Sequence, residues 1–472
     1  MEIRPIQMYR LAICGLALSP LFAYANEDGP MTPGADEQAL SEQPAVAPYA
    51  APSDVFVPES SIAKPGHEGR FAHTNYVIRN TRGVHPSTKL NDALEYLRQP
   101  APEDNPQPDS TFAEYPASLA CLYKMSSTQY AGCAPTNNSA YNAVGGARAI
   151  AIVDAYHYPT AAADLSYFNS FFGLPSNFTQ VIANGNGACV TPPVDTGWNL
   201  EAALDLQWAH AMAPKAKLIL VEACSNSYAD LMYAEQIAEQ QVLLSGGGEV
   251  SNSWGSGEWS TESSDWDWVF RSNWTSGKPI KFIFSAGDAG LGAQYPSSSP
   301  WVVSAGGTTI NRDPTTQAFQ SESCWAGSGG GTSAYELYTT TFGTGTGPWT
   351  DFQYPQFGQS ARRTPDVAAD ADPASGAYVY YNNAWYVVGG TSLAAPLLAG
   401  ITNNSNNRLG VAPSLGGYFT NAENNLLYAQ LVTNKEYGKN FYDVTTGSNG
   451  ASAAVGWDYC TGVGTPRGKL GK

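Results

Sequence analysis

The sequence predicts an α/β fold in which a mostly parallel central sheet is flanked by helices. Short, continuous apolar runs typical of buried strands recur along the chain, namely RAIAIVDA (148–155), KLILVEA (217–223), GEVSNSW (248–254), KFIFSAGD (281–288) and WVVSAGGT (301–307). Apolar segments with helical character, at 198–213 and 228–243, separate several of these runs. Strands that alternate with helices are typical of a parallel sheet covered on both faces. In such sheets functional side chains gather beyond the carboxyl ends of the strands.

The remaining elements follow from local patterns. AYVYYNNAWYVV (377–388) predicts a hairpin that turns at Asn382-Asn383. In VVGGTSLAAPLLAG (387–400) two valines end a strand, and the apolar run after Ser392 suits a helix. STKLNDALEYLR (87–98) predicts a short helix, and the four prolines of RQPAPEDNPQPDS (98–110) are typical of a linker.

The composition is acidic and unusually poor in charge. The chain has 472 residues, of which 43% are hydrophobic and only 14% charged, with a formal net charge of −17. This balance excludes a broad basic surface for nucleic acid. Because few groups ionise, protonation of carboxylates changes the net charge little, which suits a protein that works in acid.

The N-terminus predicts export. Arg4 and Arg10 form a basic region, residues 11–22 an apolar one, and Ala23-Tyr24-Ala25 a small-x-small cleavage site, so we expect a signal peptide at 1–25. No run reaches the roughly 20 apolar residues of a membrane anchor, so the protein is expected to be secreted, or periplasmic in a bacterium. Residues 26–110 are interpreted as a low-complexity pro-segment with a proline-rich linker, and residues 111–472 as the main domain.

Six cysteines remain once Cys14 leaves with the signal peptide. An even number in an exported chain favours disulfides, although six cysteines allow 15 pairings. Cys121 with Cys133 is the local pairing that we expect first. The C-x-x-C spacing of a zinc site is missing.

Ser392 is either a nucleophile at a strand-to-helix junction or a helix cap. A serine nucleophile needs a base, for which histidine is the commonest choice. His157 follows the first predicted strand and His210 lies late in a helix, but neither has the H-G-T-H context of a subtilisin-like protease. A histidine base therefore has no supporting pattern.

Carboxyl groups offer another base. Glu201 and Asp205 are four residues apart near the start of a predicted helix, which puts them on one face. Acids also favour first helical turns for the helix dipole alone, so this spacing leaves both interpretations open. Asp288 follows a buried strand in FIFSAGDAG, where it either forms a turn or, as a protonated acid, donates to a developing oxyanion.

These motifs together resemble the sedolisin family of serine-carboxyl peptidases. The resemblance runs from about Ser118 to Pro466 and rests on an ordered set, SLACLYKM, ARAIAIVDA, E-A-A-L-D, APKAKLILVEA, VSNSWG, SAGDAG, CWAGSGGGTSAYE, RRTPDVAADADP and GGTSLAAP. It implies a subtilisin-like three-layer fold and a secreted peptidase that works in acid on polypeptide substrates, as a monomer. Relatives usually carry a sizeable folded pro-domain, for which residues 26–110 are too few and too poor in apolar side chains.

Carried over by position, the resemblance implies that Ser392 is the nucleophile and Glu201 its general base. Asp205 would orient and tune Glu201, and Asp288 would supply the oxyanion donor. Peptide bonds would be hydrolysed through an acyl-enzyme on Ser392. The residues that would extend the proton network are Asp154 and Trp254.

The resemblance also implies one structural calcium ion in the C-terminal loop 441–466. Its ligands would be the carboxylates of Asp443 and Asp458 and the backbone carbonyls of Val444, Ala454 and Gly456. Hard oxygen ligands of this kind suit calcium chemically.

Two alternatives stay open at this stage. One is a secreted binding or structural protein that kept the fold without turnover. The other is a histidine-dependent subtilase-like hydrolase, which would need His157 or His210 near Ser392. Subsite preference, the choice between an endopeptidase and a tripeptidyl-peptidase, the cleavage site of the pro-segment and the oligomeric state have no readable signal.

Overall fold

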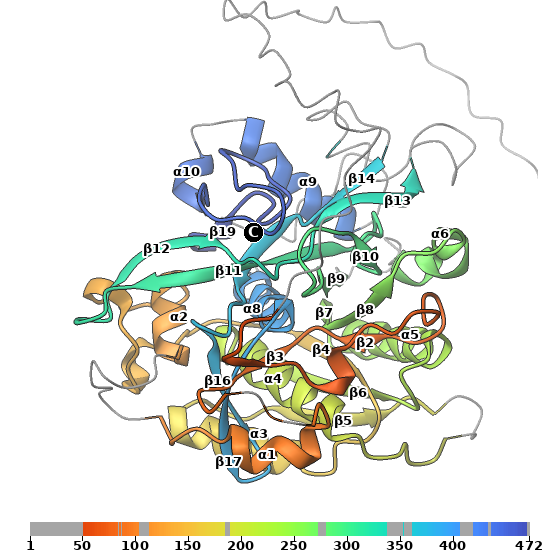
Figure 1. Ribbon diagram of the computed structural model, residues 1–472, viewed down its shortest axis with the longest axis horizontal. Coiled ribbons are helices and arrows are strands. Elements are labelled where there is room, and N and C mark those ends of the chain that lie inside the picture. The colour runs from red at the N-terminus through yellow and green to blue at the C-terminus, as the bar shows by residue number, and fades with distance from the viewer. Residues whose placement is uncertain are drawn as a thin grey trace, which may run out of the picture. The chain divides into compact units, whose positions relative to one another are not determined.

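Figure 1 shows the computed structural model of the chain. It describes residues 51–83, 85, 87–102, 113–184, 189–271, 280–337, 353, 361–405, 419–432 and 436–469. The expected signal peptide at 1–25, residues 26–50 of the expected pro-segment and most of the expected linker lie outside the described residues. No helix among the described residues combines the length and the apolar character needed to cross a membrane.

An eight-stranded sheet forms the centre of the described region, in the order β12-β11-β9-β7-β4-β6-β5 with β15 beside β11. Its strands are β4 (Ala149–Ala155), β5 (Phe178–Ile182), β6 (Lys217–Ala223), β7 (Gly248–Asn252), β9 (Ile280–Ser285), β11 (Val303–Arg312), β12 (Phe319–Cys324) and β15 (Val367–Asp370). All the pairings are parallel except that of β12 with β11. The predicted mostly parallel sheet is therefore confirmed.

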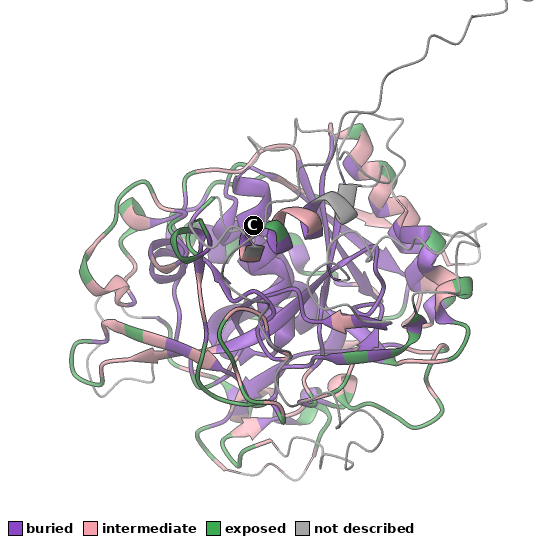
Figure 2. Ribbon diagram, turned by 90° about the horizontal axis from the view of Figure 1, so that it is seen from above, coloured by how far each residue is buried: buried purple, intermediate pink, exposed green. Residues whose placement is uncertain are grey.

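Helices cover both faces of this sheet because the side chains of its strands alternate between two cores. Ile150 and Ile152 of β4 belong to one core with side chains of α4 (Thr196–Met212) and α8 (Thr391–Asn404). Ala151 and Val153 belong to the other core, with side chains of α5 (Tyr228–Leu244). Figure 2 shows the central strands buried, with the exposed residues mostly at the periphery. The predicted three-layer arrangement is confirmed.

The smaller elements surround these layers. The further helices are α1 (Leu90–Leu97), α2 (Pro116–Leu122), α3 (Ala161–Phe172), α6 (Glu262–Trp266), α9 (Phe419–Val432) and α10 (Tyr437–Asn440). The further strands are β1 (Val55–Phe56), β2 (His73–Thr74), β3 (Val77–Arg79), β8 (Trp254–Gly257), β10 (Gln294–Tyr295), β13 (Gly331–Leu337), β14 (Ala361–Thr364), β16 (Ala377–Tyr381), β17 (Ala384–Gly389), β18 (Phe441–Tyr442) and β19 (Thr465–Pro466). The predicted hairpin is confirmed as β16 and β17, with positive φ at both turn residues, 48° at Asn382 and 61° at Asn383.

The segment 51–83 is part of the expected pro-segment at 26–110, and it contributes three short strands to the fold. β3 pairs antiparallel with β17, and β1 pairs with β3. β2 pairs antiparallel with β8, so the segment adds strands to two sheets that the rest of the chain builds (Figure 1). A segment that joins existing sheets needs few apolar side chains of its own. Tyr76 and Ile78 are two such side chains, and both are buried.

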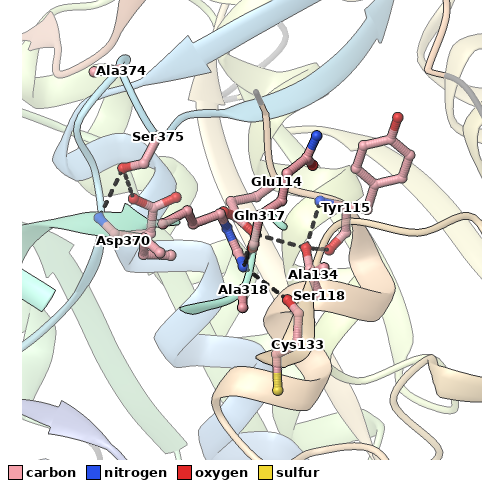
Figure 3. A network of polar contacts seen from close by, with 12 residues as sticks. Glu114, Tyr115, Ser118, Cys133, Ala134, Gln317, Ala318, Asp370, Ala374 and Ser375 are labelled. Carbon is pink, nitrogen blue, oxygen red and sulfur yellow. Dashed lines mark hydrogen bonds and ion pairs between the residues drawn. The ribbon is translucent and has the colours of Figure 1, made fainter. Parts of the chain in front are cut away.

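Figure 3 shows the network of polar contacts around Glu114, Ser118 and Cys133. Arg312 of β11 forms a bidentate ion pair with Glu114 and also donates to the carbonyl of Cys133. Ser118 of α2 donates to Glu114 at 2.7 Å. Both Arg312 and Glu114 make further hydrogen bonds besides their ion pair. This buried pair therefore fixes the position of α2 relative to β11.

Three disulfides join the six cysteines expected in the mature chain. The expected local pair Cys121–Cys133 is confirmed. The other two bonds are Cys189–Cys224 and Cys324–Cys460. Three disulfides fit an oxidising compartment outside the cytosol.

Candidate active site

The side chains of Ser392 on α8 and Glu201 on α4 contact each other where these two helices pack together. Gly390, with φ 106°, turns the chain from the end of β17 into α8, and Ser392 is the second residue of that helix. Its Oγ donates a hydrogen bond to Oε2 of Glu201 on α4 at 2.9 Å. A serine hydroxyl on a buried carboxylate is the geometry of a nucleophile with its base.

Three carboxyl groups lie together behind the serine. Burial raises the pKa of Glu201 well above its ordinary value, and Asp205 and Asp154 raise that pKa further, while the hydrogen bond from Ser392 lowers it. Burial likewise raises the pKa of Asp205, against the effect of hydrogen bonds from Ser253 and with Glu201. Groups that interact this closely share protons, so they titrate as a set.

A proline in α8 frees the backbone carbonyl of Ser392. Pro396 lies four residues after Ser392 and has no N–H to donate to that carbonyl. The hydroxyl of Ser253 comes within 3.3 Å of it and donates to Asp205 Oδ1 at 2.8 Å. The Ser253 hydroxyl therefore lies between the backbone carbonyl of Ser392 and the carboxyl group of Asp205.

Asp288 lies just beyond the carboxyl end of β9, against the first turn of α8. The N–H and the Oγ1 of Thr391 both donate to Asp288 Oδ1, whereas Oδ2 is buried and finds no hydrogen-bond partner within the described part of the chain. Burial raises the pKa of Asp288 to about 7, although the two bonds from Thr391 oppose this. Asp288 is therefore neutral in acid and has a free oxygen that can carry the proton.

Comparisons with known proteins bear on the family of this chain. The profile of the subtilase family matches residues 179–408. Kumamolisin from Bacillus sp. (strain MN-32) is 31% identical over 63% of this chain and 55% of its own length. The structure of Pseudomonas sedolisin, a serine-carboxyl proteinase, superposes with a TM-score of 0.58 at 24% identity, over 76% of this chain and 96% of that one. These matches support the sedolisin family for this chain. Tripeptidyl-peptidase 1 of Dictyostelium discoideum is 28% identical over 68% of this chain and 53% of that protein, so the chain spans about half the length of these curated relatives.

The two residues predicted to extend the proton network, Asp154 and Trp254, differ in their contacts. Both carboxyl oxygens of Asp154 are buried without a hydrogen-bond partner among the described residues, and burial, Asp205 and Glu222 raise its pKa. The indole N–H of Trp254 donates to the backbone carbonyl of Val153 at 3.0 Å. Trp254 thus contacts the strand that carries Asp154 through its backbone, not through the carboxyl group.

The histidines that could have served as a base are engaged elsewhere. His157 lies 2.9 Å from Glu222, and His210 lies 2.7 Å from the carbonyl of Pro175. In the described part of the chain, no histidine hydrogen-bonds Ser392. The geometry at Ser392 therefore favours the carboxyl base.

The predicted calcium ligands lie together in one loop. Asp443 accepts from the N–H of Gly456, and Asp458 accepts from the N–H of Ala454, so both carboxylates border the same short stretch. The hydroxyl of Tyr437 lies within 3.1 Å of both Asp443 Oδ1 and the Gly456 carbonyl, which shows that these two oxygens face one point. Val444, the next residue after Asp443, is buried. Among the described residues no group of three or more acidic, histidine or cysteine side chains could hold a metal, so a cation here would depend on backbone carbonyls. This set of oxygens fits calcium in its chemistry.

Three residues at the site were missed from the sequence. Ser253 belongs to the motif NSWG and Thr391 to the motif GGTS. Their positions in these motifs could have indicated that they lie near Ser392. Asn75 had no such signal. It lies 317 residues from Ser392 in the sequence, yet its N–H approaches Ser392 Oγ at 3.2 Å.

Proposed function

We propose that this chain is a serine-carboxyl peptidase that hydrolyses polypeptides in acid. The observation that carries the proposal is the 2.9 Å hydrogen bond from Ser392 Oγ to Glu201, with Asp288 beside the first turn of the same helix. The kinship with kumamolisin and the tripeptidyl-peptidases supports polypeptides as the substrate class.

The chemistry follows from these positions. Glu201 takes the Ser392 proton as the hydroxyl attacks the substrate carbonyl, and returns it to the leaving amine. Asp205 holds Glu201 in place and adjusts its pKa. The oxyanion would receive hydrogen bonds from the Ser392 N–H, which has no partner within its own helix because it lies in the first turn, and from protonated Asp288.

Calcium and export belong to the same proposal. Asp443, Asp458 and the carbonyls of Val444, Ala454 and Gly456 would hold one calcium ion, which would tie the two ends of the loop together. The apolar N-terminal stretch and the three disulfides support a secreted or periplasmic location. We expect a monomer.

The test is proteolysis of labelled, denatured albumin from pH 3 to 8, after incubation of the enzyme in acid. Ser392→Ala and Glu201→Gln should each lose activity by about 10³-fold or more, as the loss of a nucleophile or its base does elsewhere. His210→Ala should keep activity. Glu235→Gln is the matched control, because Glu235 is also a fully buried helical glutamate but lies on α5. Full activity in Glu201→Gln, or its loss in His210→Ala, would point to the histidine-dependent alternative.

A further inference from the structure

Asp154 and Glu222 are neighbours on the face of the central sheet that α4 covers. They are paired in register where β4 runs parallel to β6, and each is 1% exposed. Side chains at paired positions of neighbouring strands point to the same face. Ile150 and Ile152 of β4 belong to the core that also contains side chains of α4, so Asp154, two residues further on, lies on that side. Glu222 therefore belongs to the same buried layer as the Ser392 site.

The carboxyl group of Glu222 is surrounded by hydrogen-bond partners. Nδ1 of His157 lies 2.9 Å from Glu222 Oε2. Glu222 Oε1 accepts from the N–H of Tyr158 and from Nε2 of Gln180, each at 2.7 Å. Donors in this arrangement favour the charged form of a buried carboxyl group. The His157 side chain is 24% exposed, so water screens its own charge from the buried groups.

Asp154 lacks such donors. Both of its carboxyl oxygens are buried and find no hydrogen-bond partner within the described part of the chain. Burial raises the pKa of Asp154 well above its ordinary value, and the charges of Asp205 and Glu222 raise it further. A buried carboxyl group without donors costs less in its protonated form than in its charged form. Asp154 is therefore the place where these carboxyl groups hold a proton at the lowest cost.

The charge of Asp154 affects the proposed base. Burial, Asp205 and then Asp154 raise the pKa of Glu201. A charged Asp154 would thus keep a proton on Glu201, which must be free of it to accept the proton of Ser392. A neutral Asp154 removes this obstacle.

The other acidic side chains near this layer have donors of their own. Asp164 on α3 accepts from the hydroxyl groups of Tyr158 and Thr160, each at 2.7 Å. Asp195 precedes α4 and accepts from the N–H of Trp198 at 3.0 Å. Their charges are therefore compensated locally.

We propose that Glu222 is a positioning residue for the reaction at Ser392. Its negative charge holds one proton of the buried carboxyl groups on Asp154. The negative charge that these groups share then stays available to Glu201, which can act as the base. Glu222 acts through Asp154 and not on the substrate. This inference rests on the proposed function.

The first test is the pH profile of kcat, measured with acid-incubated enzyme on labelled, denatured albumin. Glu222→Gln keeps the size of the side chain but removes its charge, so Asp154 should ionise more readily and Glu201 should keep its proton to higher pH. The acid limb of the profile should move upward by about one pH unit, and kcat on that limb should fall about tenfold. An unchanged limb, or a loss of kcat by one factor at every pH, would overturn the inference.

A second substitution should reverse the shift. Asp154→Asn cannot ionise, so the acid limb of the double variant Glu222→Gln/Asp154→Asn should return to its wild-type position. The maximal kcat of Asp154→Asn should be lower than that of wild type, because an amide cannot share a proton with Asp205, but its acid limb should stay in place. Asp164→Asn is the matched control, since it removes a carboxyl group that is 5% exposed and bonded to Tyr158, and its limb should also stay in place. A double variant that keeps the shifted limb contradicts the role of Glu222.

Infrared spectroscopy tests the same inference without activity, in the Ser392→Ala background. The difference between this parent and its Asp154→Asn variant at pH 6, where an ordinary aspartate is ionised, should contain the C=O band of a protonated carboxyl group. Glu222→Gln should lose this band at a pH about one unit lower than the parent does.

The two kinds of failure can be told apart. If the infrared band is missing while wild type digests albumin in acid and Ser392→Ala and Glu201→Gln do not, the inference fails and the proposed function stands. If wild type does not digest albumin, or does so without Ser392 or Glu201, both fail.

Discussion

Thr391 fixes the orientation of Asp288 through two hydrogen bonds to one oxygen. The backbone N–H and the Oγ1 of Thr391 each reach Asp288 Oδ1 at 2.8 Å. Because Thr391 Oγ1 accepts from the N–H of Gly287, its own proton is directed to Asp288. Oδ1 is therefore an acceptor, and a proton on Asp288 must reside on Oδ2, the oxygen beside the proposed oxyanion position.

This orientation predicts the behaviour of Asp288→Asn. The amide oxygen can replace Oδ1 and the NH₂ group can replace protonated Oδ2, so the donor is kept and no longer ionises. Wild-type activity should fall as pH rises through about 7, since Asp288 becomes charged there. In kcat profiles of the acid-incubated enzyme, Asp288→Asn should lack this decline and Asp288→Ala should lose about 10²–10³-fold at pH 4. An unchanged decline in Asp288→Asn would assign the ionisation to another group.

Thr391 should influence the pH at which Asp288 ionises. Its hydrogen bonds lower the pKa of Asp288, so Thr391→Val should raise this pKa and move the decline in activity to higher pH. The maximal kcat should also fall, because the carboxyl group loses one of the two bonds that orient it. Thr391→Ser restores the hydroxyl and should follow the wild-type pH profile. A lower kcat with no shift of the profile would mean that Thr391 acts on packing alone.

The parts of the site predicted from sequence are those that depend on side-chain identity. Ser392, Glu201 and Asp288 were singled out through the resemblance of their motifs to a known family, because the proposed roles of nucleophile, base and oxyanion donor restrict the residue types at these positions. The hairpin was found for a similar reason, since its two-residue turn has positive φ at Asn382 and Asn383, which asparagine tolerates. Local chemistry of this kind leaves a signal in the sequence.

The parts that were missed depend on the backbone or on long-range contact. Asn75 contacts Ser392 and Ser253 through its N–H and C=O, which every residue except proline offers. β2 and β3 have two and three residues, too few for a hydrophobic period to show. The bond Cys324–Cys460 closes a loop across 136 positions, and nothing local distinguishes it from the other pairings.

Buried carboxyl groups predict that the protein is most stable in acid. Burial raises the pKa of Glu262 from 4.5 to about 10, and that of Asp267 from 3.8 to about 7. Above pH 4 to 5 the unfolded chain releases these protons while the folded chain keeps them, so the free energy of unfolding falls as pH rises towards 7. The slope from each group is about 1.4 kcal/mol per pH unit at most. Thermal unfolding of Ser392→Ala, which cannot digest itself under the proposed mechanism, should show a higher Tm at pH 4.5 than at pH 7.

Glu262 offers a direct check of that slope. Glu262→Gln removes the ionisable group but keeps acceptor and donor atoms for Trp259 and Ser298. In the Ser392→Ala background it should narrow the difference in Tm between pH 4.5 and pH 7. Glu95→Gln, at a side chain that is 81% exposed, is the control and should leave the difference unchanged. A higher Tm at pH 7 than at pH 4.5 in the parent would contradict the assignment.

Removal of calcium by a chelator should lower the thermal stability of the folded chain if the proposed calcium site exists. An ion that binds only the folded chain stabilises it by about 2.7 kcal/mol when free calcium is a hundred times its Kd. In Ser392→Ala, EDTA should therefore lower the Tm, and Asp443→Asn should lower it without EDTA and abolish the further effect of the chelator. Asp443 is the better position to change, because Asp458 also accepts from the N–H groups of Cys460 and Thr461 and its loss would disturb the loop directly. Asp313→Asn, at an exposed turn, is the matched control. Equal EDTA sensitivity in Asp443→Asn and in its parent would place the ion elsewhere.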